Sequence, residues 1–418
     1  MKYFSISLIS VILLFLSSTA KAQVNSAYSR FGVGDLELTY SAKRDGMGVV
    51  GIAIPDYDFI NVDNPATLVG LKMTRFSTGI VWGGNLQNYN NSSKFYGNAD
   101  FNGFTLGFPI SSTNGVGAAF GIVPVTRISY NIKVPHASQD TVLNTYYTNY
   151  SGSGGISKVF ISASYKLPFD LSLGAAFNYY FGKLKYSSAL DFKDNSSLNS
   201  SYTNSISTQG LGTTVGILTP NFAEIFNSDK ISDFRIGASM DYVGKLSADS
   251  MVTGDASVGL DTLSDGSFKI KIPYRLSFGA SMVYNKNYVF SAEYMYQPWG
   301  NFTYKGYSSN DLRTFNRFDL GFEYKPEKGY EKTFWEQVQY RAGLSIETTQ
   351  YIVDGQGINQ YSIYGGFSIP LSFVNSLDIG LQLSTRGTNR NDLIKENFFQ
   401  LDVGVNLGEL WFIRAENQ

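Results

Sequence analysis

The chain has 418 residues, of which 16% are charged and 15% aromatic, and 42 are glycine. Soluble domains carry about 25% charged residues, and the formal net charge of −1 gives no electrostatic reason to bind nucleic acid. The absence of cysteine excludes disulfides, a lipoprotein anchor and thiolate chemistry.

The first 22 residues have the pattern of a secretory signal peptide. Lys2 supplies the positive charge, Ile6 to Leu16 an apolar core, and Ala20-Lys21-Ala22 the cleavage site. No later stretch has the roughly 18 consecutive apolar residues of a membrane helix. Export, many aromatics and few charges together predict a β-barrel in the bacterial outer membrane. A secreted soluble β-protein is the alternative.

Residues 23–72 contain glycines and short apolar patches without a sustained period. This stretch is too long for a simple lead-in to the first strand, so we expect an N-terminal plug, or hatch, inside the barrel. The alternatives are a periplasmic tail and an extra strand pair.

From residue 73 onward, apolar and polar residues alternate in segments of about ten or more residues, as in membrane barrels. We expect strands at 73–84, 98–110, 115–131, 155–167, 171–187, 205–217, 233–245, 271–284, 288–300, 312–325, 337–350, 358–370, 376–388 and 397–412. The predicted fold is therefore all-β, a 14-stranded antiparallel transmembrane barrel over 73–418. The long gaps 132–154, 188–204 and 246–270 are expected to be extracellular loops.

If the aromatic face of each strand meets lipid, the charged residues on the opposite face line the interior. They are Arg127, Arg275, Glu293, Arg317, Asp319, Glu323, Arg341, Glu347, Asp378, Arg386 and Asp402. Charges facing lipid near the bilayer centre would cost about 2–4 kcal/mol each. Mutual ion pairs that fill the interior are one interpretation, and a path for a ligand or ion is the other.

Nothing in the sequence favours an enzyme. The single histidine, His136, lies in a predicted loop, and without cysteine there is no cluster for a transition metal. No catalytic or phosphate-binding motif is present. We therefore expect no cofactor, no metal and no catalytic residue.

Pro124 interrupts the third predicted strand, "GIVPVTRISY". Proline removes a ladder hydrogen bond, and a closed barrel has no edge strand to accommodate it. We therefore expect a kink or bulge at this position.

"DGMGVVGIAIPDYDFINVDNPATL" resembles the start of the long-chain fatty-acid transporter (FadL-type) family, in which an "NPA" tripeptide precedes the first strand. Here the tripeptide is Asn64-Pro65-Ala66. The blocks "SAYSRFGVGDL", "YSGSGGISKVF", "QYRAGL" and "STRGTNRNDLIKENFF" are similar to a divergent branch of that family. The resemblance implies a plugged 14-stranded barrel, with ligands leaving sideways at a third-strand kink, for which Pro124 and Arg127 are the candidates.

Two functions remain open. The first is passive uptake of small hydrophobic or amphipathic solutes, with outer-membrane lipid and such solutes as partners. Apolar hatch residues that could line the path are Phe31, Met47, Ile52 and Phe59, although the charged interior argues against fatty acids. The second is a non-transporting barrel that serves as a subunit of an outer-membrane secretion or assembly complex, with other outer-membrane proteins as partners.

Overall fold

A computed structural model describes residues 26–89, 92–111, 114–136, 146–192, 199–256, 259–327, 329, 331–391 and 393–409. The predicted signal peptide lies outside these ranges. Within them, no helix combines the length and the apolar character needed to cross a membrane.

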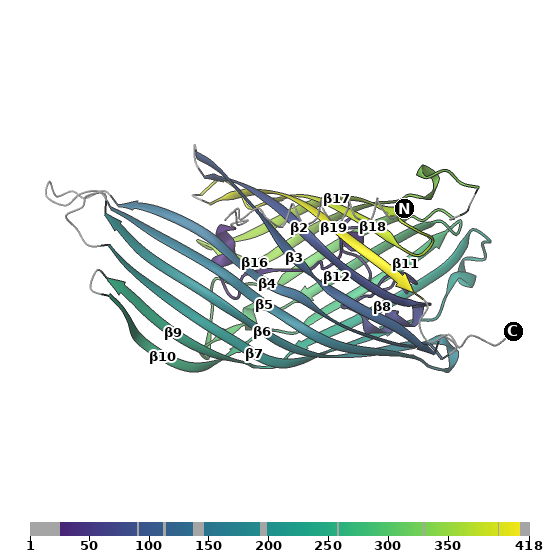
Figure 1. Cartoon of the computed structure of the whole chain (residues 1–418), viewed down its shortest axis with the longest axis horizontal. Coiled ribbons are helices and arrows are strands. Elements are labelled where there is room, and N and C mark those ends of the chain that lie inside the picture. Colours follow the sequence, from purple (N-terminus) through teal and green to yellow (C-terminus); the bar gives the residue numbers. More distant parts are fainter. Residues whose placement is uncertain are drawn as a thin grey trace, which may run out of the picture.

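The wall is a closed antiparallel barrel of fourteen strands, as predicted (Figure 1). The wall strands are β2 (Thr74–Tyr89), β3 (Ser92–Ser111), β4 (Val116–His136), β5 (Tyr146–Lys166), β6 (Ser172–Phe192), β7 (Ser200–Leu218), β8 (Ile231–Val243) continued by β9 (Leu246–Ala256), β10 (Gly259–Lys271) continued by β11 (Arg275–Tyr284), β12 (Tyr288–Gln297), β15 (Phe315–Tyr324), β16 (Gln339–Val353), β17 (Gln356–Pro370), β18 (Ser376–Arg386) and β19 (Lys395–Glu409). The ladder between β19 and β2 closes the barrel.

Short elements occupy the remaining chain. They are the 3-10 helices η1 (Ala27–Arg30), η2 (Pro65–Gly70), η3 (Pro168–Asp170), η4 (Ala223–Phe226), η5 (Trp299–Asn301) and η6 (Trp335–Gln337), the α-helix α2 (Ala42–Asp45), and the two-residue strands β1 (Asp35–Leu36), β13 (Thr303–Tyr304) and β14 (Tyr307–Ser308).

Strict alternation explains why the wall segments form strands. In β16 the outward residues Tyr340, Leu344 and Ile346 are exposed, whereas Arg341 and Glu347 on the other face are buried. Successive side chains of a strand point to opposite faces, so this pattern gives an apolar outer surface and a polar interior.

Several strands are longer than the sequence indicated. β5 and β6 each have 21 residues, about twice the length that crosses a bilayer. The expectation of a loop over 246–270 is wrong, because β9 and β10 pair along most of it, and the loops expected at 132–154 and 188–204 are shorter than predicted. His136 is accordingly the last residue of β4. In β9 and β10 the outer residues are mostly polar, whereas inward residues such as Leu246, Ala248 and Ile270 are buried in the core. The apolar-outward alternation that revealed the other strands is therefore lost.

Residues 26–73, called here the N-terminal segment, contact strands on many sides of the barrel. α2 packs on β17, β18 and β19, and η2 packs on β4 to β7. Glycines allow the close approach at both places: a Cβ on Gly380 would lie 2.7 Å from the Ala42 carbonyl oxygen, and one on Gly174 would lie 2.2 Å from the Ala66 nitrogen.

Candidate functional site

The β3–β4 boundary is paired over only part of its length. The ladder joins residues 104–111 of β3 to residues 116–122 of β4. Beyond it, within the described residues, 92–103 pair with β2 alone among the wall strands, and 123–136 pair with β5 alone. We call this unpaired boundary the seam. In Figure 1 the tip of the β2–β3 hairpin diverges from β4.

A β-bulge in each strand marks the start of the seam. β4 has one extra residue, Val125, between the pairs that Pro124 and Thr126 make with β5. β3 has one extra residue opposite Gly79, and Gly103 there has a φ of +93°. A Cβ on Gly103 would lie 2.3 Å from the Ile122 carbonyl oxygen. The irregularity that the sequence predicts at Pro124 is thus present, and it coincides with the end of the ladder.

The N-terminal segment takes the place of β3 along the free part of β4. β1 pairs with Thr126 and Arg127. On one side of this pair Glu37 N–H donates to the Val125 carbonyl at 3.0 Å, and on the other Ser26 N–H donates to the Ser129 carbonyl at 2.7 Å. The backbone edge of β4 is therefore satisfied from the bulge to Ser129.

Arg127 joins three parts of the chain at the seam. Its Nε lies 3.0 Å from Glu37 Oε1, and its Nη1 forms an ion pair with Asp100 on β3. It therefore connects β4 both to the N-terminal segment and to the strand across the seam.

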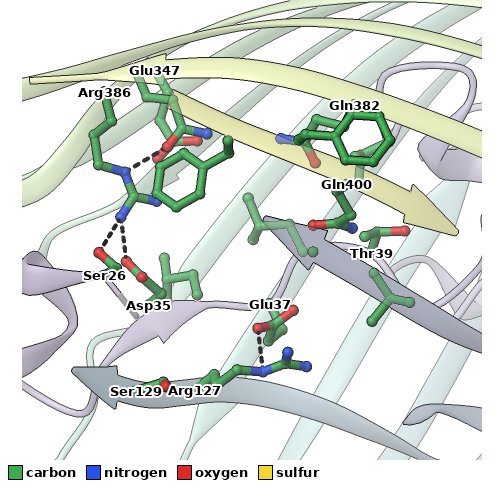
Figure 2. Close-up of a pocket in the computed structure, with 18 of the residues that line it drawn as sticks. Ser26, Asp35, Glu37, Thr39, Arg127, Ser129, Glu347, Gln382, Arg386 and Gln400 are labelled. Carbon is green, nitrogen blue, oxygen red and sulfur yellow. Dashed lines mark hydrogen bonds and ion pairs between the residues drawn. The ribbon is translucent and has the colours of Figure 1, made fainter. Parts of the chain in front are cut away.

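A polar cavity of about 140 Å³ lies beside the seam (Figure 2). Its lining includes Arg127, Glu37 and Asp35, together with Arg386 and Glu347 from the opposite wall. Arg386 donates to Asp35 Oδ1 at 2.7 Å and to Ser26 Oγ at 3.2 Å. Ligand pockets usually measure about 300–1,000 Å³ and are mostly apolar, so this cavity is small and unusually charged.

The predicted interior charges have partners within the barrel. Arg317 contacts Asp319 (2.7 Å), Arg341 contacts Glu323 (2.8 Å), and Arg275 contacts Asp63 (3.1 Å) and Asp241 (3.4 Å). Glu293 accepts hydrogen bonds from the backbone N–H groups of Gly51 and Ile52. Several of these contacts connect the wall to the N-terminal segment.

Asn64-Pro65-Ala66 connects the start of η2 to the rest of the N-terminal segment and to the barrel wall. Asn64 caps η2 by accepting from Ala66 N–H at 3.1 Å, and its Nδ2 donates to the Ile52 carbonyl at 2.6 Å. The same Nδ2 lies 3.2 Å from the Ile217 carbonyl on β7. Proline suits the first helical turn, and a Cβ on Gly216 would lie 1.9 Å from Asn64 Oδ1. The tripeptide therefore fixes η2 against β6 and β7.

Of the apolar residues expected to line a ligand path, Ile52 and Phe59 share a small cavity of about 20 Å³, whereas Phe31 and Met47 pack elsewhere. Phe31 packs beside Tyr351, with ring centroids 6.1 Å apart. Met47 is buried in a separate cluster with Val50 and Ile54. Phe59 stacks on Tyr40 at 6.0 Å. These side chains serve as local core of the N-terminal segment.

Sequence reasoning missed a buried ion cluster around Asp56. Asp56 contacts Lys43 Nζ (2.8 Å), Arg44 Nη2 (3.4 Å) and Lys325 Nζ (2.6 Å). Lys325 directly follows β15, so the cluster fastens the N-terminal segment to the wall. A buried carboxylate among three cations is recognisable only once residues 43, 56 and 325 are known to be neighbours.

Comparison with known proteins agrees with the FadL-type resemblance. The structure of CymD, a monoaromatic hydrocarbon channel, matches with a TM-score of 0.58 at 16% identity, covering 92% of this chain and 100% of that one. The toluene transporter TbuX of Ralstonia pickettii matches with 0.58 at 15% identity (88% and 98% covered). A FadL homologue of Pseudomonas aeruginosa matches with 0.61 at 12% identity (89% and 99% covered). At these identities the likeness concerns the fold.

No curated protein sequence matches the chain significantly. One family model, BamG, matches residues 2–417, almost the whole length. The chain therefore belongs to the BamG family and has the FadL-type outer-membrane barrel fold.

Proposed function

We propose that this protein is a barrel subunit of an outer-membrane protein assembly or secretion complex, in which residues 23–72 act as a fixed plug. The observation that carries the proposal is the packed, cross-linked interior. The described part of the N-terminal segment is held by buried ion pairs and hydrogen bonds to β12, β15, β18 and β19. A scaffold needs such rigidity, whereas a moving hatch would have to break these bonds.

The character of the interior also favours a scaffold. The cavity beside the seam is small and charged. Next to it, aromatic and aliphatic side chains such as Tyr28, Ile128, Trp299, Phe315 and Tyr351 form one buried core. Hydrophobic solutes would meet ion pairs and packed side chains. The name of the matching family, BamG, points in the same direction.

Gentle detergent extraction of the full chain from its native membrane, followed by native mass spectrometry, tests this function. We expect a stoichiometric complex with at least one other outer-membrane protein. Recovery of a monomer that carries only lipid, from extractions that preserve other membrane complexes, would overturn the proposal.

The seam supports a second candidate function, passive passage of small hydrophobic or amphipathic solutes. The solved channels of the same fold are described as hydrocarbon channels and transporters. A break in the wall beside a cavity offers a sideways exit, and Arg127 with its two acidic partners would be the latch.

The variant Arg127→Ala distinguishes the two functions. It removes the ion pair to Asp100 across the seam and the ion pair to Glu37 of the N-terminal segment, and each charge-assisted contact contributes about 1.5–3 kcal/mol. If the seam is an exit, uptake of a fluorescent hydrophobic dye by proteoliposomes should rise at least tenfold, because the loss of even one such contact, about 1.5 kcal/mol, corresponds to about a factor of ten. Arg235→Ala, which removes the Arg235–Asp233 contact on β8, is the matched control. Under the scaffold proposal neither variant changes uptake.

A further inference from the structure

The edge of β3 that faces β4 is open along residues 92–103 of the described wall. Residues 92–103 bond to β2 on one side, and on the other side no described strand pairs with them. The edge of β4 that faces them is already occupied by residues 26–37 from Val125 to Ser129. Along this stretch β4 cannot satisfy β3 without displacing the N-terminal segment.

An open edge of this kind is a ready site for pairing with another chain. On β3, Phe95 and Phe101 are 70% and 59% exposed, so the outer face of this edge also offers apolar side chains. Natural edge strands are usually short, bulged or covered, whereas this one runs from Ser92 to the bulge at Gly103 without a proline.

A groove lies alongside the same edge. A cavity of about 290 Å³ is lined by Lys94 and Tyr96 of β3 and, across the seam, by Asn131 and Lys133 of β4. Asn149, Ser151, Ser187 and Ala189 complete the lining. Lys133 Nζ lies 4.0 Å from Asp191 and 4.0 Å from the Tyr147 ring centroid, which leaves its ammonium loosely paired. The groove is therefore polar and carries two positive charges.

We propose that the free edge of β3 is the docking site for an extended segment of a partner polypeptide, which adds to residues 92–102 as an extra strand. Strand addition draws affinity from main-chain hydrogen bonds and specificity from pockets for alternate side chains. The partner segment would place apolar side chains beside Phe95 and Phe101. It would place an acidic side chain in the groove, between Lys94 and Lys133.

β1 is a precedent within the molecule. Only two residues long, it adds to β4 at the same seam and is held there by backbone bonds. The seam thus already accepts one added strand, on the β4 side. This inference rests on the proposed function as a complex subunit and names where the partner binds.

Site-specific photo-crosslinking in cells tests the docking site. The full chain carries the photoreactive benzoylphenylalanine in place of Tyr96 or Asn98 on the groove side, or Phe95 on the outer face. Phe177, which faces outward on β6, is the control position. We expect mass spectrometry to place the cross-links from β3 on one extended segment of a different polypeptide. Positions 96 and 98, two residues apart on the same face of β3, should cross-link to residues of the partner that are also two positions apart.

The double variant K94E/K133E is the matched functional test, with K183E/K185E as control. Lys183 and Lys185 are exposed on β6 and do not line the groove. We expect K94E/K133E to reduce co-purified partner about tenfold or more, because two charge-assisted contacts are lost, and K183E/K185E to leave it unchanged.

Other outcomes overturn the inference. Cross-links to lipid alone, to a second copy of this chain or to a helical segment would do so. A complex that survives K94E/K133E and shows no cross-link at β3 would refute the docking site while leaving the subunit function intact. If native mass spectrometry finds no partner at all, the proposed function fails first.

Discussion

Replacing Asp56 with asparagine is expected to lower the free energy of unfolding by about 3–5 kcal/mol, the usual cost of removing one partner of a buried ion pair. Asp56 is the hub that three cations share, and its side chain is 2% exposed. The variant leaves Lys43 and Lys325 in contact with Asp58, and it leaves Arg44 without its ion pair to Asp56. Urea unfolding in detergent micelles, followed by gel mobility, measures the change.

Glu327→Gln is the matched control. Its carboxylate lies 3.9 Å from Lys332, but the Glu327 side chain is 76% exposed, and exposed pairs contribute about 0–1 kcal/mol. Equal unfolding midpoints for the two variants would contradict the assignment of Asp56 as a fastener between the N-terminal segment and the wall.

The same cluster makes an acid-dependent contribution. Burial alone would raise the pKa of Asp56, but Lys325, Lys43 and Arg44 hold it well below its usual range. A carboxyl whose pKa is lowered on folding stabilises the protein above its unfolded pKa of about 3.9, and this stabilisation is lost as the pH falls further. Below about pH 4 the stability difference between the native chain and Asp56→Asn should therefore narrow.

Replacing Asn64 with alanine is expected to lower the free energy of unfolding by about 2–4 kcal/mol. The side chain is fully buried, so its loss leaves the Ile52 carbonyl and the Ala66 N–H without their partners. Each buried group left unpaired costs about 1–3 kcal/mol, and loss of the helix cap adds to this. We expect a lower unfolding midpoint and faster proteolysis within residues 51–72.

Asn221→Ala provides the comparison. Asn221 also precedes a 3-10 helix, accepts from Ala223 N–H at 2.9 Å and donates to the Ser232 carbonyl at 2.9 Å. It is exposed, so water can replace these bonds and the cost should stay near or below about 1 kcal/mol. If Asn221→Ala lowered the free energy of unfolding as much as Asn64→Ala does, burial of the Asn64 side chain would not be the cause of the effect.

The wall was predictable from sequence because each strand carries its own signal. Alternation such as that of Tyr340, Leu344 and Ile346 against Arg341 and Glu347 depends on residues within one strand. This alternation of apolar and polar residues is absent where the outer residues of a strand are polar, which is why β9 and β10 were expected to be a loop. The irregularity at Pro124 was also predictable from the sequence, because the missing N–H is a property of proline itself.

The partners of the N-terminal segment were not predictable in this way. β1 has only two residues, and neither of them suggests that it replaces β3 along β4. The carboxylates of Asp35 and Asp56 are ordinary in sequence, and their partners Arg386 and Lys325 lie hundreds of residues away. Such pairs become visible only when the closed barrel brings them together.

One of these contacts has a consequence for the order of folding. Ser26 Oγ donates to Glu396 Oε2 at 3.0 Å, and Ala27 N–H donates to Glu396 Oε1 at 2.9 Å, across about 370 residues of chain. Glu396 lies on β19, the strand that closes the barrel against β2. Contacts so distant in sequence form slowly, so residues 26 and 27 gain these two bonds only once β19 is in place, although Ser26 also bonds to β4. Closure of the wall and the final fixing of the start of the segment are therefore one late event, and a chain that stops before β19 can complete neither.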